Sequence, residues 1–152
     1  MPTRDELDLR NSVREQARDR CEYCQIRQDQ DAYYEFHLEH ITARQHGGRT
    51  EETNLAWSCH HCNLHKGPNL TGIDPRTNEI TPLFNPRRDR WEKHFRWDGP
   101  ILVGRTATGR TTIAVLQINN DDRVELRQVL IDQGLFPPKP VAGRPKKPRR
   151  ST

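Results

Sequence analysis

Residues 59–67 read CHHCNLHKG, which places two cysteines, three histidines, an asparagine and a lysine in nine consecutive positions. A second cysteine pair with the same spacing stands upstream, in CEYC at residues 21–24. Two such pairs can supply four thiolates to one tetrahedral zinc ion, because each short turn places its two sulfurs on the same side. We therefore predict a zinc site with the ligands Cys21, Cys24, Cys59 and Cys62.

A site with four cysteine ligands has no open position for water or substrate, so the predicted zinc is structural. The two pairs are separated by 34 residues, more than the roughly 15 to 20 of simple zinc ribbons. This spacer must therefore be folded itself. The thin apolar composition, 32% hydrophobic against 30% charged residues, also favours a metal that helps to hold the fold.

The pattern of the spacer predicts a hairpin followed by a helix. In YYEFHLEHI, residues 33–41, Tyr34, Phe36 and Leu38 alternate with polar residues, as in a half-buried strand. NLAWS, residues 54–58, suits the returning strand, and the second cysteine pair leads into a short helix that the glycine and proline at residues 67–68 should end.

Helices are predicted on both sides of this unit. Thr3 and Glu6 form a capping box for a helix over about residues 4–19. Its arginines at positions 10, 14 and 18 form either a solvated face or a surface for DNA. Residues 111–119 and 121–134 predict two further helices, the second capped by Asp121 or Asp122 and ended by Gly134. Residues 74–78 carry only turn signals.

Taken in order, the segments CEYC, LEHI, HGG, NL, CHHCN and KG resemble the His-Asn-His (HNH) endonuclease superfamily. The resemblance covers residues 21–67, and residues 71–119 are similar to a C-terminal extension of small bacterial HNH proteins, which extends it to about residue 138. It implies an α+β fold built on a ββα-metal finger, braced by the four-cysteine zinc site, with flanking helices and a disordered basic C-terminal tail. We expect one nuclease domain over residues 1–138, with its core at 21–67 and a helical or loop extension at 68–138.

The resemblance also implies roles for five residues. His40 would be the general base, and Glu39 and Asn63 would bind a catalytic Mg²⁺ or Mn²⁺. Asn54 would hold the loop between the strands, and Lys66 would lie near the phosphate. An imidazole suits the activation of water near neutral pH, and a hard cation suits the charge on phosphate oxygens.

Adjacent strand residues point to opposite faces, so Glu39 and His40 can serve one site only if the strand ends or bulges there. An isolated pair of this kind is otherwise a polar strand end. Arg87, Arg88 and Arg90 are candidates for contacts to the DNA backbone. The tail, residues 139–152, holds six of the 25 basic residues, which leaves 19 against 21 acidic ones elsewhere. It would bind an anionic backbone loosely or act as a solubilising terminus.

The sequence thus predicts a metal-dependent DNA endonuclease that nicks or cleaves double-stranded DNA with a histidine base. The alternative is a zinc-finger module that binds DNA on the same scaffold without catalysis. The chain shows neither a signal peptide nor a membrane span, so we expect a cytoplasmic protein. Its oligomeric state cannot be predicted from these patterns.

Overall fold

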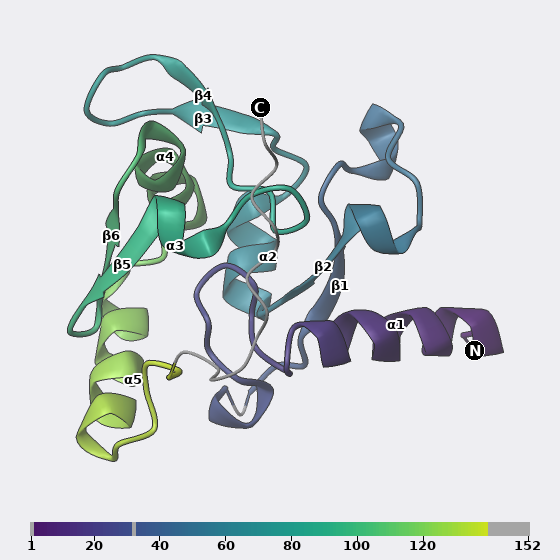
Figure 1. The fold of residues 1–152 in the computed structure, drawn as a ribbon, viewed down its shortest axis with the longest axis horizontal. Coiled ribbons are helices and arrows are strands. Elements are labelled where there is room, and N and C mark those ends of the chain that lie inside the picture. The colour runs from purple at the N-terminus through teal and green to yellow at the C-terminus, as the bar shows by residue number, and fades with distance from the viewer. Residues whose placement is uncertain (1, 32, 140–152) are drawn as a thin grey trace, which may run out of the picture.

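The computed structural model describes residues 2–31 and 33–139 of the chain (Figure 1). The helices are α1 (Arg4–Gln16), α2 (His60–Lys66), α3 (Trp91–His94), α4 (Ala107–Leu116) and α5 (Asp121–Asp132). The strands form three antiparallel pairs, β1 (His37–His40) with β2 (Leu55–Ser58), β3 (Thr71–Ile73) with β4 (Ile80–Pro82), and β5 (Phe95–Asp98) with β6 (Ile101–Gly104). This mixture of helices and short strand pairs is the predicted α+β class. Among the described residues, no helix has the length and apolar character needed to cross a membrane.

Helix α1 begins at the predicted capping box and packs against β2. The Thr3 hydroxyl accepts from the Glu6 backbone N–H, and the Glu6 carboxylate accepts from the Thr3 N–H. The helix ends at Gln16, before the predicted residue 19, because the backbone turns left-handed just beyond it. Arg10 and Arg14 lie over the Trp57 ring, at 4.8 and 5.8 Å from its centroid. Arg10 and Arg14 thus also contact the hairpin, while Arg14 and Arg18 stay exposed, as the solvated-face interpretation expects.

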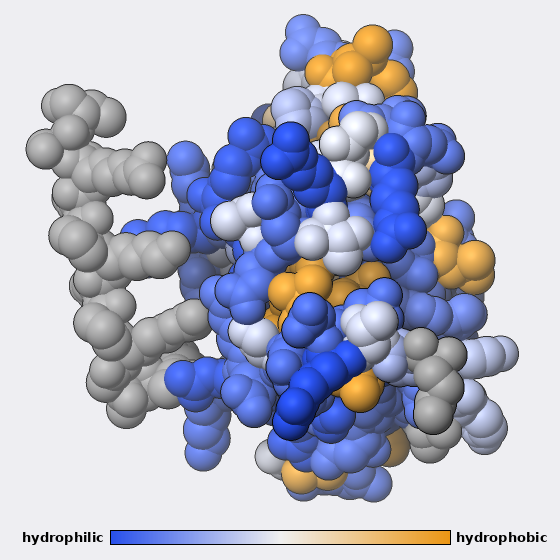
Figure 2. Space-filling view, turned by 90° about the vertical axis from the view of Figure 1, so that its right-hand side faces the viewer, coloured by the Kyte–Doolittle hydropathy of each residue, from blue (hydrophilic) through white to orange (hydrophobic). Residues whose placement is uncertain are grey.

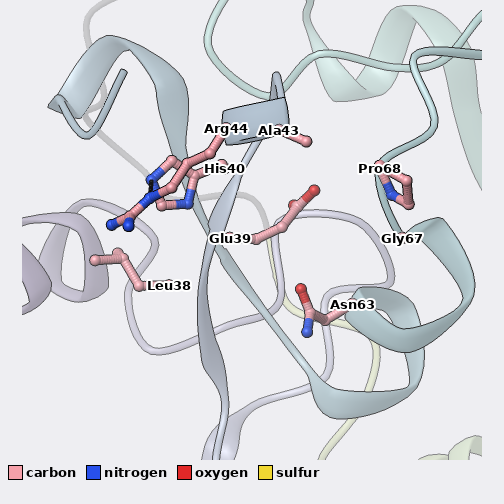
Figure 3. A pocket seen from close by; sticks show the side chains of 8 residues that line it. All are labelled: Leu38, Glu39, His40, Ala43, Arg44, Asn63, Gly67 and Pro68. Atoms are coloured by element: carbon pink, nitrogen blue, oxygen red, sulfur yellow. Dashed lines mark hydrogen bonds between the residues drawn. The ribbon is translucent and has the colours of Figure 1, made fainter. Parts of the chain in front are cut away.

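Strands β1 and β2 and helix α2 form the predicted ββα unit. The two strands pair in regular register from His37 opposite Ser58 to His40 opposite Leu55, and every residue of β2 is buried. The alternation predicted over residues 34–39 is wrong in two places, because Tyr34, which precedes β1, is 57% exposed and Glu39 only 5%. Helix α2 packs against β1 and covers the side to which Glu39 points (Figures 1 and 3).

The segment after residue 68 contains more strand structure than its sequence indicated. The β3–β4 and β5–β6 hairpins were not predicted, since strands of three or four residues are too short to show a period. Both final helices were predicted, but Asn120 rather than an aspartate stands at the N-cap of α5, without a side-chain bond. Gly134 follows α5 with φ +74°, the left-handed conformation typical of a helix end.

This C-terminal segment packs directly on the first cysteine turn. The Trp91 indole donates to the Tyr23 carbonyl at 2.9 Å, and the Trp97 indole donates to the Gln25 side chain at 2.8 Å. Phe95 is buried in a core that also contains Tyr23 and all four cysteines. The ββα unit and its extension thus share one hydrophobic core. The predicted tail lies, from residue 140 onward, outside the described residues.

Candidate metal sites and pocket

The four cysteines predicted as zinc ligands lie together and are fully buried. Their sulfur atoms are all within 4.8 Å of one another, and the Cys24 and Cys59 sulfurs are 3.7 Å apart. Zinc–sulfur bonds of about 2.3 Å in a tetrahedron would space two sulfurs by about 3.8 Å. The donor set and its spacing therefore fit a structural zinc ion.

Two kinds of donor surround these sulfurs. In each CxxC turn the second cysteine's backbone N–H donates to the first sulfur, at 3.5 Å in the first pair and 3.4 Å in the second. Arg123 of α5 donates to the Cys59 sulfur at 3.7 Å and to Asp31 at 3.1 Å. Burial lowers the pKa of Arg123, but the charges of Cys24, Cys59 and Asp31 outweigh it and raise that pKa overall. Sequence reasoning missed Arg123, because it lies 64 residues beyond Cys59.

An open pocket with a volume of about 280 Å³ lies where the end of β1 faces α2 (Figure 3). It brings together three of the predicted catalytic residues, His40, Glu39 and Asn63. The complete lining is Leu38, Glu39, His40, Ala43, Arg44, Asn63, Gly67 and Pro68. Arg44, an exposed cation at this pocket, was not identified from the sequence, although it stands four residues after His40.

Glu39 and Asn63 both extend into the gap between β1 and α2 (Figure 3). One Glu39 oxygen accepts from the Tyr23 hydroxyl at 2.7 Å, and the other lies 2.6 Å from the Lys66 ammonium. That second contact is an ion pair without hydrogen-bond geometry, so Oε1 is left without a directional donor. Burial raises the pKa of Glu39, although Lys66 and Tyr23 act to lower it.

One carboxylate and one carboxamide are oxygen ligands of the kind that Mg²⁺ and Mn²⁺ prefer, usually with several waters completing the shell. The buried Glu39 Oε1 that lacks a directional donor is a suitable ligand atom for such a cation. The residues at this position therefore fit a hard divalent cation.

His40 leaves β1 on the side opposite Glu39 and lies beside Arg44 (Figure 3). The strand ends at His40 as the geometry required, but it has no bulge there, so the two side chains share the pocket without converging. The His40 Nε2 atom is 2.8 Å from the Thr50 hydroxyl and 3.5 Å from the Arg44 Nε. Burial, followed by the Arg44 charge, lowers the pKa of His40 below its ordinary value. A lowered pKa favours the neutral imidazole, which is the form that can accept a proton.

Asn54 holds the loop that follows β1. Its carboxamide oxygen accepts from the Thr42 N–H at 2.8 Å, while its nitrogen donates to the carbonyls of Thr42 at 3.0 Å and Arg49 at 2.8 Å. Gly48 allows this close arrangement, because a Cβ there would lie 1.7 Å from the Thr42 oxygen. These contacts are of the kind expected for Asn54, and its contribution to catalysis stays a prediction.

Two of the predicted DNA-contacting residues are not at the surface. Lys66 is only 2% exposed and pairs with Glu39, and Arg87 pairs with Glu22 through side chains that are 12% and 14% exposed. The sequence showed their charges but not the buried carboxylates that neutralise them. Arg88 and Arg90 are exposed, so their assignment to DNA stays a prediction.

With this geometry established, the chain was compared with known proteins. Residues 21–69 match the family model described as HNH endonuclease. This segment is similar to HNH endonuclease domains. Both cysteine pairs and every residue that lines the pocket lie within it.

A curated relative, the Septu protein PtuB of Bacillus thuringiensis, is 27% identical to the chain over 125 residues. The match covers 81% of this chain and 46% of that protein, so the chain spans about half the length of the relative. Since 125 residues exceed the extent of the HNH domain, the similarity to PtuB continues into the flanking segments. No solved structure gave a significant match.

Proposed function

We propose that this protein is a metal-dependent endonuclease that hydrolyses phosphodiester bonds of double-stranded DNA. The observation that carries the proposal is the pocket inside the HNH match that His40, Glu39 and Asn63 all line. The domain would extend over residues 1–138, since α1 and the C-terminal hairpins share its core.

In the proposed reaction His40 accepts a proton from the attacking water. Its lowered pKa favours the neutral ring, and the contact to Thr50 fixes its orientation. A divalent cation bound by Glu39 and Asn63 would neutralise the negative charge that develops on the phosphate oxygens. Arg44 is the exposed cation of the pocket, so it can bind a phosphate oxygen next to His40.

The four cysteines would hold a structural zinc ion. The protein would lie in the cytoplasm, where thiols stay reduced. The face shown in Figure 2 is largely hydrophilic, with separate apolar areas. Double-stranded DNA is the proposed substrate because residues 21–69 match the HNH endonuclease model, and the exposed Arg88 and Arg90 could contact its phosphates.

A second candidate function is DNA binding without cleavage. It is favoured by the paired state of Glu39, whose two oxygens already contact Tyr23 and Lys66, and by the opposite directions of Glu39 and His40. This candidate predicts salt-sensitive binding that survives the loss of His40, without metal-dependent turnover.

Relaxation of supercoiled plasmid in Mg²⁺ or Mn²⁺ tests the proposal. Wild-type protein, His40→Ala and a matched control, His46→Ala, would be purified identically, checked for equal zinc content and assayed with and without EDTA. His46 suits the control because it is exposed in the same loop but does not line the pocket. Metal-dependent nicking that only His40→Ala abolishes supports the nuclease. DNA binding without nicking by zinc-loaded wild type supports the second candidate.

A further inference from the structure

The candidate divalent-cation site contains a cation supplied by the chain itself. The Lys66 ammonium lies 2.6 Å from Glu39 Oε1 and donates to the Ile41 carbonyl at 3.0 Å. Lys66 is 2% exposed and Glu39 5%, so this ion pair is screened little by water. Buried lysines are rare unless they are paired, which makes this placement informative.

The position of Lys66 follows from the ββα geometry. Lys66 stands three residues after Asn63 on α2, so both lie on the side of the helix that faces the end of β1, where Lys66 contacts Glu39 and Ile41. There the ammonium contacts a carboxylate and a backbone carbonyl, which are oxygen donors of the kind that bind hard divalent cations. The oxygen it approaches, Glu39 Oε1, is the one without a directional hydrogen-bond donor.

We propose that Lys66 is the resident cation of this site and that its ammonium must leave Glu39 when a divalent cation binds; this inference rests on the proposed metal-dependent function. Two cations at one buried carboxylate oxygen repel each other strongly where water is scarce. A buried carboxylate without any cation is equally unfavourable. Exchange of Lys66 for a divalent cation avoids both states, so Lys66 weakens metal binding while it keeps the empty site folded.

Tyr23 holds the other oxygen of Glu39 while Lys66 is exchanged for the divalent cation. Its hydroxyl bonds the other carboxylate oxygen, Oε2, at 2.7 Å and is itself buried next to the first cysteine pair. Glu39 can therefore keep its orientation when Lys66 departs. The exchange involves Oε1 alone, and Tyr23 is a positioning residue in both states.

Direct Mn²⁺ binding tests the exchange without any measurement of DNA cleavage. Titration calorimetry at pH 8 would compare wild type with Lys66→Met, which keeps most of the side-chain volume, and with Lys93→Met. Lys93 is an exposed lysine of α3, so the control removes the same charge outside the site. If the ion pair is formed in about nine molecules in ten, its removal should raise the apparent Mn²⁺ affinity about tenfold, whereas Lys93→Met should match wild type. Equal affinities of all three proteins would overturn the proposal.

A measurement on the wild-type protein keeps the test valid if Lys66→Met does not fold. Acylation of lysines by an activated acetate ester, followed by peptide mass spectrometry, reports how accessible each ammonium is. Saturating Mn²⁺ should increase the acylation of Lys66 several-fold and leave Lys93 unchanged, relative to NaCl at equal ionic strength. Protection of Lys66 that persists in saturating Mn²⁺ would show a purely structural ion pair.

The two proposals fail in different ways. If Mn²⁺ releases Lys66 but the protein never nicks DNA, the exchange of Lys66 is supported and the proposed nuclease activity is contradicted. Metal-dependent nicking with a Lys66 that stays protected supports the nuclease and contradicts the exchange.

Discussion

The hydroxyl of Tyr23 connects the first cysteine pair with Glu39, and Tyr23→Phe removes this single group. The Tyr23 side chain is 0% exposed, and its ring packs edge-on against Phe84 at 6.3 Å. A phenylalanine would keep that packing. The variant therefore isolates the 2.7 Å bond to the Glu39 carboxylate.

The size of the stability loss in Tyr23→Phe depends on how the Glu39 carboxylate is left. Hydrogen bonds to charged groups contribute about 1.5 to 3 kcal/mol, and Glu39 Oε2 would be left buried without its donor. We expect a loss of about 2 kcal/mol in the free energy of unfolding. For a chain of this length that corresponds to a melting temperature about 4 to 8 °C lower.

The loss should also depend on pH. Burial raises the pKa of Glu39 in the folded protein, and loss of the Tyr23 bond should raise it further. A carboxyl group whose folded pKa lies above its unfolded value of about 4.3 reduces stability as pH rises between the two values. Below the unfolded pKa both states are protonated and this contribution vanishes. The difference between Tyr23→Phe and wild type should therefore be larger at pH 8 than at pH 5.

Urea unfolding followed by circular dichroism, with excess zinc present at both pH values, measures this difference. Tyr34→Phe is the matched control, because Tyr34 is 57% exposed and should change stability by less than about 0.5 kcal/mol. A loss below about 0.5 kcal/mol for Tyr23→Phe, or an equal loss at both pH values, would refute the reasoning.

Four further predictions concern His40, Arg123, Arg87 and Arg88. The nicking rate should rise with pH to a plateau with its midpoint below about 6.5, because burial lowers the pKa of His40; a midpoint above about 7 would contradict this. Arg123→Met should lower zinc affinity about 10- to 100-fold in competition with a chromophoric chelator, since the residue contacts a ligand sulfur, and an unchanged affinity would exclude that role. Arg87→Met should lower the free energy of unfolding in urea by about 3 kcal/mol, because Glu22 would lose its cation and keep only the bond from the Trp57 N–H. The exposed Arg88→Met should not affect stability but should weaken DNA binding at low salt, and the reverse pattern would be inconsistent with the structure.

Local sequence signals predicted several parts of the structure correctly. The capping box at Thr3 and Glu6 depends on groups three residues apart, so the chain forms it without distant partners. The cysteine turns are equally local, and tetrahedral zinc chemistry then requires the two pairs to meet. The ββα unit between them followed from this requirement together with the short strand and helix signals around it.

By itself, then, the sequence determined the four-cysteine cluster, the ββα order and the approach of His40, Glu39 and Asn63 to one pocket. Only the tertiary structure decided which charges reach solvent. Arg87 pairs with Glu22 across 65 residues, and Lys66 turns inward to a carboxylate on β1. The physical reason is that a buried charge needs an opposite charge or several hydrogen-bond acceptors around it, as Lys66 has in Glu39 and Arg127 has in backbone carbonyls, and such partners come from other elements of the fold.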